Sequence, residues 1–488
     1  MNAPWLLAIC TWNFGDLRLK KTLELLIERM LSKLTVCLRK LGEDRAGEVR
    51  FGRFLANKKV TTERLTEGIC APTALSAAGR HVLMIEDTTE INYQAHAGRV
   101  QGLGTVGNGK DLGLFLHPLL AVDAENGACL GLAAIHLWLR TKSADPKYHK
   151  LPIEDKESYR WLTTAQAGKE CLADAQRLTV IADRESDIYE MWARLPDERT
   201  DLLLRACHDR AVETEHGSLF TWLSGLDVAG TYTHPVRARA GKRSAHVALL
   251  HVRYGRVKIK RPLHCSDPNA PESIEVTAID VVEDASSVVG AEEPIHWRLL
   301  TTHTIETMSD ARRIIGWYSQ RWHIEQTFRT LKKQGMNIES SQVETADGLK
   351  KLVCLALGVA VRTMQLTLAR DDQSDSPASD VFSESEIEIL IHRALHLTGV
   401  IWSRLGKWII LSLAFIIHGR WVSSRLGSEP MRTAWTTWSG YDGLMAFAVR
   451  PATMPEAGDW VMVGSCAANA VVARPSRPER SSNGRAPR

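Results

Sequence analysis

Two short stretches of this 488-residue chain decide its fold: His81-Val-Leu-Met-Ile-Glu86, which is followed by Asp87, and Arg177-Leu-Thr-Val-Ile-Ala182, which is followed by Asp183. Compact apolar runs of this kind are typical of buried β-strands. Side chains that follow directly on such strands emerge at the edge of the sheet, where sites assemble in α/β folds. A single strand-end carboxylate is more often a cap or an ion-pair partner, so neither aspartate alone indicates a function.

The sequence around these two stretches predicts a mixed α/β sheet. The next predicted elements, in order, are strands at Leu114–Val122 and Cys129–Leu139 joined by the turn Asp123-Ala-Glu-Asn-Gly127, a helix at Ser158–Cys171, a helix at Glu185–Leu195 and a strand at Asp201–Ala206. A three-stranded meander followed by alternating helix and strand is typical of an α/β fold.

Length and composition set broad limits. A chain of 488 residues suggests about three domains, and 44% hydrophobic with 24% charged residues excludes a largely disordered or fibrous protein. The 61 Lys and Arg nearly balance the 57 Asp and Glu, so any nucleic-acid-binding surface must be local. Nine scattered cysteines form no C-x-x-C motif, and the first residues lack a basic signal-peptide region. The longest candidate membrane span, Trp408–Ile417, is too short for a membrane helix, and we therefore expect a cytoplasmic protein.

Two segments carry a local excess of positive charge. Residues 1–60 hold twelve Lys and Arg against six Asp and Glu, on helices predicted between residues 12 and 60. Val236–Arg261, inside a distinct β-rich block at 214–305, holds nine Lys and Arg and no acid, alternating with apolar residues. Each pattern has two interpretations. The helices either present a solvated face or bind DNA, and the strand pair is either a charge-protected edge or a face that follows a nucleic-acid backbone.

A long helix is predicted at Ser309–Gly335, and another at Ala346–Arg370. At about 100° per residue, four polar residues of the first helix fall within about 60° of arc: Tyr318, Arg321, Glu325 and Lys332. That stripe is either a surface ion-pair ladder or part of a site. Three carboxylates brought together would suit two Mg²⁺ ions, or Mn²⁺ as a substitute, which can clamp the attacking and leaving oxygens of a phosphodiester.

These motifs resemble a known family. The segments Ile85-Glu-Asp87-Thr-Thr and Ala182-Asp183-Arg-Glu-Ser-Asp187, with the Tyr-Arg-Glu-Lys spacing on the long helix, look like the signature of DDE transposases. More narrowly, they are similar to the cut-and-paste enzymes of the insertion-sequence-four family, typified by the Tn-five transposase. The β-rich block lies in the gap between the second and third acids, and the resemblance covers about residues 12–450.

The resemblance implies a ribonuclease-H-like core in which Asp87, Asp183 and Glu325 are the catalytic metal ligands. It also implies DNA contacts by Tyr318, Arg321, Lys332, Trp297, Arg205, Arg18, Lys20, Lys21 and Arg53. In the family a flipped base stacks on an aromatic residue while a DNA hairpin forms, and Trp297 matches that position. The alternative for Trp297 is an ordinary buried strand residue.

The expected organisation has four parts: a helical DNA-end-binding domain at 1–72, the core at 73–370 with the β-rich insertion at about 214–305, a helical dimerisation domain at 371–450 and a disordered tail at 451–488. The expected function is metal-dependent transposition at terminal inverted repeats, by a homodimer that also binds target DNA in the bacterial nucleoid. The rivals are a silent transposase-derived DNA-binding protein or inhibitor, and a nuclease without strand transfer.

Overall fold

The structure is a computed structural model. It describes residues 14–107, 109–140, 151–236, 244–265, 267–290, 292–333 and 335–370, and the single residues Trp12, Tyr148, Phe382 and Ile387. The predicted dimerisation segment at 371–450 lies outside the described residues except for Phe382 and Ile387, and the predicted tail at 451–488 lies wholly outside them.

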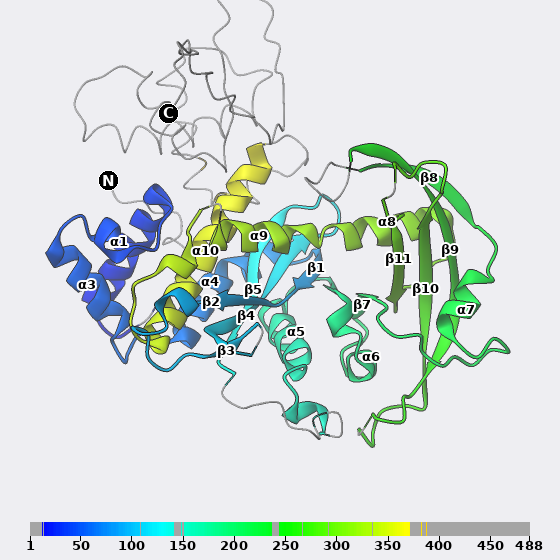
Figure 1. Cartoon of the computed structure of the whole chain (residues 1–488), viewed down its shortest axis with the longest axis horizontal. Coiled ribbons are helices and arrows are strands. Elements are labelled where there is room, and N and C mark those ends of the chain that lie inside the picture. The colour runs from blue at the N-terminus through cyan, green and yellow to red at the C-terminus, as the bar shows by residue number, and fades with distance from the viewer. Residues whose placement is uncertain are drawn as a thin grey trace, which may run out of the picture.

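The predicted N-terminal helices are confirmed. They are α1 (Leu17–Lys33), α2 (Leu38–Gly42), α3 (Arg45–Leu55) and α4 (Thr62–Ala77). The side chains of Asp16, Asp44 and Thr61 cap α1, α3 and α4 by accepting hydrogen bonds from backbone N–H groups of the first turn. Helices α1 and α3 lie at one end of the molecule, beside α10 (Ala346–Arg370), as Figure 1 shows.

Helix α10 matches its predicted bounds and belongs to the core. By length and composition it could cross a membrane, but 78% of its most apolar window is buried inside the protein, which is the pattern of a core helix. The span Trp408–Ile417 falls outside the described residues.

The two stretches that decide the fold form neighbouring parallel strands, β1 (His81–Glu86) and β6 (Arg177–Ala182). The other strands are β2 (Thr89–Asn92), β3 (Gly104–Val106), β4 (Asp111–Asp123), β5 (Cys129–Trp138), β7 (Thr200–Arg205), β8 (Gly230–Val236), β9 (His246–Lys260), β10 (Ser273–Glu283) and β11 (His296–Thr301). The predicted meander is confirmed, because β1, β4 and β5 pair in antiparallel fashion. Strand β7 then pairs in parallel with β6. This mixed sheet is consistent with a ribonuclease-H-like core.

The β-rich block does not form a sheet of its own. Strand β11 pairs with β7, and β10, β9 and β8 follow, so that the block extends the central sheet. Among the described strands β9 is not an edge, because it lies between β8 and β10. Three of its basic residues pair with acids, Arg256 with Glu275 at 3.0 Å being the shortest of these pairs. Some of the basic residues that alternate along β9 are therefore explained by ion pairs with acids on neighbouring segments.

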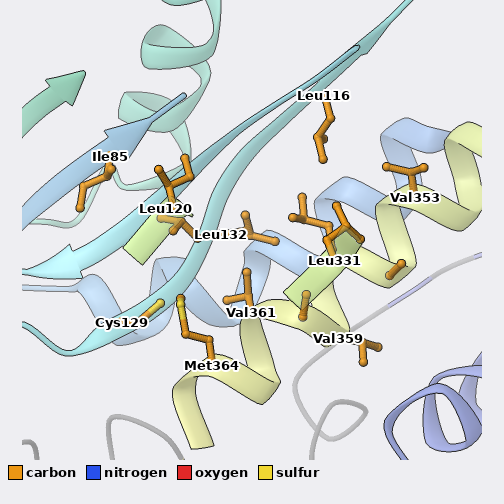
Figure 2. Close-up of a cluster of buried hydrophobic side chains, with 14 of the residues drawn as sticks. Ile85, Leu116, Leu120, Cys129, Leu132, Leu331, Val353, Val359, Val361 and Met364 are labelled. Carbon is orange, nitrogen blue, oxygen red and sulfur yellow. The ribbon is translucent and has the colours of Figure 1, made fainter. Parts of the chain in front are cut away.

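Helices cover both faces of the sheet. Alternate residues of β1 point to opposite sides, Leu83 and Ile85 into one hydrophobic cluster and Val82 and Met84 into the other. The first cluster includes side chains of α8 (Met308–Ser319), α9 (Trp322–Lys332) and α10, and Figure 2 shows α10 packed there against β4 and β5. The second includes α5 (Tyr159–Cys171), α6 (Tyr189–Arg194) and α7 (Leu219–Ser224).

The prediction of one helix at Ser309–Gly335 is wrong in one respect. The segment forms two helices, α8 and α9, which run end to end along the sheet (Figure 1). Thr307 and Asp310 form a capping box at the start of α8. The interruption consists of Gln320 and Arg321, whose backbone dihedrals stay in the right-handed helical region. Because the backbone stays helical at the break, Arg321 and Glu325 of the polar stripe still lie on one face and form an ion pair.

Candidate active site

The first two predicted acids lie at equivalent ends of neighbouring strands. Ile85 of β1 is in register with Ile181 of β6, and each strand ends at the next residue, so that Asp87 and Asp183 follow in the same register. Asp87 lies in the break between β1 and β2, which pair one after the other with β4. Asp183 caps the short helix Arg184–Ser186 by accepting a hydrogen bond from the Glu185 backbone N–H at 2.9 Å. The sheet therefore presents two carboxylates side by side.

Arg321 connects the third acid to the first. Its guanidinium donates to Asp87 Oδ2 at 2.8 Å and also pairs with Glu325. The Asp87 side chain is 18% exposed and that of Glu325 is 52% exposed. The sequence left open whether the polar stripe is an ion-pair ladder or part of a site. Arg321 fits both interpretations, because it forms the i,i+4 pair with Glu325 and also contacts Asp87.

The electrostatics of Asp87 indicate a carboxylate cluster. Burial raises the pKa of Asp87 to about 6, and the negative charges of Asp183 and Glu325 add to this rise, while Arg321 opposes it. A neighbouring negative charge raises the pKa of a carboxyl only when it lies close by, so two further carboxylates lie near Asp87. Three hard oxygen donors with unbalanced negative charge fit a divalent cation.

The described residues do not hold a formed metal site. No group of three or more His, Cys, Asp or Glu side chains among them lies close enough to share an ion. Arg321 accounts for this in part, because its guanidinium pairs with the carboxylates of both Asp87 and Glu325. The three carboxylates therefore suit a metal ion chemically. In this conformation the Arg321 guanidinium pairs with two of them.

Besides Arg321, the predicted DNA-contacting residues Tyr318 and Arg205 lie close to the acids, and Trp297 lies near Tyr318. Burial raises the pKa of the Tyr318 phenol, while the nearby charges of Arg321 and Arg205 lower it. Arg205, the last residue of β7, donates to the His296 backbone carbonyl at 3.0 Å. Trp297 of β11 is half-buried, and its ring centroid lies 6.4 Å from that of Tyr318.

The remaining predicted DNA contacts are farther along the molecule. Lys332, at the end of α9, lies 3.8 Å from Glu339, and its pKa is lowered by burial and raised by Glu339 and Glu90. The four N-terminal residues are on the helices beyond α10 (Figure 1): Arg18, Lys20 and Lys21 on α1, and Arg53 on α3. Arg18 is highly exposed and pairs with Asp16. The structure does not bring these four residues to the acids.

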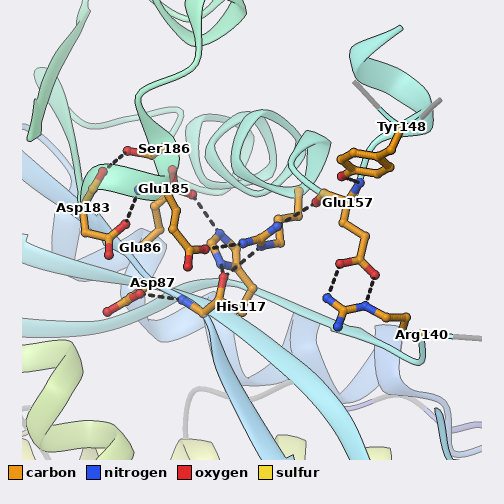
Figure 3. A network of polar contacts seen from close by, with 11 residues as sticks. Glu86, Asp87, His117, Arg140, Tyr148, Glu157, Asp183, Glu185 and Ser186 are labelled. Atoms are coloured by element: carbon orange, nitrogen blue, oxygen red, sulfur yellow. Dashed lines mark hydrogen bonds and ion pairs between the residues drawn. The ribbon is translucent and has the colours of Figure 1, made fainter. Parts of the chain in front are cut away.

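Sequence reasoning missed a buried polar network behind Asp87, parts of which Figure 3 shows. Glu86 is fully buried, and its Oε2 lies 3.3 Å from His117 Nε2. His117 Nδ1 lies 2.8 Å from the Thr88 hydroxyl, and the oxygen of that hydroxyl accepts a hydrogen bond from Arg160 at 2.9 Å. A signal existed, because Glu86 and His117 are polar residues inside otherwise apolar strand sequences.

Part of the chain that contains two of the three acids matches a known protein family. Residues 163–362 match the family model described as the transposase DDE domain. Over these residues the chain is similar to transposases with a DDE domain. The DDE domain match includes Asp183, Trp297 and Glu325 and begins after Asp87. It supports a DNA transposition enzyme, and transposases of this kind generally use divalent metal ions and bind DNA.

The raised pKa of Asp87 predicts an effect on stability. Because the pKa of Asp87 is about 6 in the folded protein against 3.8 without perturbation, the unfolded state releases its proton first. Stability contributed by Asp87 is therefore present below about pH 4 and is lost as the pH rises through about 6. At pH 8 without divalent metal, Asp87→Asn should raise the free energy of unfolding by about 2 kcal/mol.

Urea denaturation in a chelating buffer at pH 8 and at pH 4 measures this effect, and the gain should vanish at the lower pH. Asp197→Asn is the matched control with the opposite sign. For Asp197 burial alone would raise the pKa, but the hydrogen bonds from Lys169, Thr200 and the Arg199 backbone together outweigh it, so that its pKa falls to about 2. An Asp87→Asn protein less stable than wild type at pH 8 would mean that burial and the neighbouring acids do not disfavour the charged Asp87 carboxylate.

Proposed function

We propose that this protein is a cut-and-paste transposase of the insertion-sequence-four type, in which Asp87, Asp183 and Glu325 hold two divalent ions. The observation that carries the proposal is the register of β1 and β6, which places two aspartates side by side next to the Arg321–Glu325 pair. The ions, Mg²⁺ or Mn²⁺, would supply charge stabilisation for phosphodiester hydrolysis and strand transfer.

The residues around the acids then divide the work on DNA. Arg321 has a planar fork suited to a phosphate, and its present carboxylate partners are the groups that metal ions would neutralise. Arg205 and Tyr318 lie next to it and can bind further phosphate oxygens. Lys332 lies farther along α9 and offers a point charge to the same backbone.

Trp297 is proposed to stack on a flipped base while a hairpin forms at the cleaved end. Its ring is half-buried rather than fully enclosed, and it lies beside Tyr318. Extruding a base costs a few kcal/mol, and stacking on an aromatic ring contributes about 1–3 kcal/mol in return. A ring that is partly exposed beside Tyr318 can supply this contact.

The other parts of the chain are assigned by proposal. The helices of residues 1–72 bind the terminal inverted repeat through Arg18, Lys20, Lys21 and Arg53, residues 73–370 form the catalytic core, and residues 371–450 join two copies in the synaptic complex. Exposure of Arg18, Lys21 and Arg53 supports the first assignment. Arg18 and Lys21 lie on α1, whose opposite face is buried through Leu23 and Leu26.

The test uses purified protein, DNA that carries the element's flanking repeats, Mg²⁺ and a target plasmid. We expect nicked, hairpin and blunt-ended products, followed by joining to the target. Cleavage without joining favours the rival nuclease, and end binding without cleavage favours the silent DNA-binding protein. Either result contradicts the proposal.

Replacing Trp297 separates the hairpin steps from the first nick. Loss of a stacking contact worth about 1–3 kcal/mol should slow hairpin formation and opening by about 5- to 150-fold in Trp297→Ala. Trp297→Phe should retain most of the activity, because a phenyl ring also stacks. Time courses of the three DNA products give the separate rates.

Trp222→Ala is the matched control for this experiment. Trp222 is also half-buried, but it belongs to the hydrophobic cluster on the other face of the sheet, where it packs near Gly255. Its loss should leave the product ratios unchanged. Equal hairpin rates in Trp297→Ala and wild type would remove Trp297 from the mechanism.

A further inference from the structure

Arg160 contacts residues next to both strand-end aspartates, Thr88 and Glu185, and forms no hydrogen bond with either aspartate carboxylate. It is the second residue of α5, and its side chain is 11% exposed. Its guanidinium carbon lies 5.5 Å from the ring centroid of Trp138 and 5.2 Å from that of Trp161. A guanidinium held over two indole rings and screened from water has few alternative positions.

The guanidinium joins the segments that follow β1 and β6. Its Nε donates to the Thr88 hydroxyl at 2.9 Å, and one terminal nitrogen donates to Glu185 Oε2 at 2.9 Å. Thr88 is the residue after Asp87, and Glu185 is two residues after Asp183. One side chain thus bridges the two loops that carry the acids.

The same two residues orient the acids through their backbones. The Thr88 N–H donates to Asp87 Oδ1 at 2.8 Å, and the Glu185 N–H donates to Asp183 Oδ1 at 2.9 Å. Each aspartate is therefore oriented by the residue that Arg160 holds. Figure 3 shows Asp87 and Asp183 next to each other with Glu185 beside them.

Thr88 is also fixed from its other side. A guanidinium can only donate, so the Thr88 oxygen accepts from Arg160 and its own proton is available to His117 Nδ1, 2.8 Å away. His117 and its other partner, Glu86, are fully buried. The Thr88 hydroxyl therefore has little freedom to turn.

We infer that Arg160 is a positioning residue that sets the separation and orientation of the Asp87 and Asp183 carboxylates through Thr88 and Glu185. The inference rests on the proposed function, because it presumes that these carboxylates bind divalent ions. Groups that orient metal ligands from behind typically change metal affinity by about 10- to 100-fold when they are replaced. Arg160 should do so without contacting DNA or metal.

The test measures Mn²⁺ binding to the full-length protein without DNA, by titration calorimetry, and the unfolding midpoint of each variant. Arg160→Gln should weaken Mn²⁺ binding by about 10- to 100-fold. Arg160→Lys should behave like Arg160→Gln, because an ammonium group cannot reproduce the two-armed contact. The double variant Arg160→Gln with Glu185→Ala should bind Mn²⁺ no more weakly than Arg160→Gln alone, since both act through one contact.

Arg194→Gln is the matched control. Arg194 also bridges two distant segments, with Nε 2.7 Å from Asp267 Oδ2 and a terminal nitrogen 2.6 Å from Glu154 Oε1. Its loss should affect the unfolding midpoint without weakening Mn²⁺ binding.

Three results would overturn the inference. The first is wild-type Mn²⁺ affinity in Arg160→Gln. The second is wild-type Mn²⁺ affinity in Arg160→Lys, which would mean that a positive charge at residue 160 is sufficient and that the two hydrogen bonds are not needed. The third is an equal loss of affinity in Arg194→Gln, which would trace the effect to general destabilisation. A wild-type protein that binds no Mn²⁺ at all would instead contradict the proposed metal site.

Discussion

Glu325→Gln should abolish DNA cleavage while end binding and folding persist. The fold depends little on Glu325, because its side chain is half-exposed and forms an i,i+4 ion pair with Arg321. Such exposed helical pairs contribute only about 0.3–0.5 kcal/mol to stability. If Glu325 completes the metal site, its loss should lower the cleavage rate by a factor on the order of 10³ or more.

Gel assays of cleavage and of end binding, made on the same preparations, check this prediction. Glu275→Gln is the matched control, because Glu275 is also half-exposed and pairs with Arg256 on a neighbouring strand. Glu275→Gln removes one negative charge, as Glu325→Gln does, but at a position outside the three acids. A Glu325→Gln protein that cleaves as fast as Glu275→Gln would exclude Glu325 from the chemistry.

Asp187→Ala should destabilise the protein by about 3–5 kcal/mol. Asp187 closes the motif Ala182-Asp183-Arg-Glu-Ser-Asp187, yet its side chain is fully buried and accepts from Arg210 at 2.6 Å. It also accepts from the backbone N–H of Cys207 at 2.8 Å. Removing it leaves the Arg210 guanidinium buried without its carboxylate partner, which is the costly way to break a buried pair.

The shift of the urea denaturation midpoint measures this loss. Glu213→Ala is the comparison, because Glu213 is 41% exposed and lies 3.9 Å from Lys258. A surface pair of that kind contributes at most about 1 kcal/mol. If Asp187→Ala and Glu213→Ala lose equal stability, the Asp187–Arg210 pair does not hold the segment after Asp183 in place.

Much of the central sheet could be predicted from sequence because its strands are short apolar runs with clear ends. The runs 81–86 and 177–182 match β1 and β6 residue for residue. The two aspartates were predictable for the same reason, since a polar residue after a buried strand has to lie at the sheet edge. Their register was not, because it depends on the hydrogen bonds between the strands.

Other features depend on tertiary contacts that no local pattern records. The break at Gln320 and Arg321 carries no Gly or Pro, and its backbone stays helical, so the sequence offers no breaker. The role of Arg160 depends on Thr88 and Glu185, which lie 72 and 25 residues away in the chain. The continuation of the sheet through β11 likewise depends on its pairing with β7.

The most direct test of the proposed active site is a crystal structure of the protein bound to a DNA end in the presence of Mn²⁺, with the metal located by its anomalous scattering. Our account predicts Mn²⁺ in contact with the carboxylates of Asp87 and Asp183, with Glu325 completing the ligand set and the Arg321 guanidinium moved from the acids to a phosphate. A complex in which Arg321 still pairs with Asp87 and Glu325, and in which no anomalous peak lies between the three acids, would contradict it.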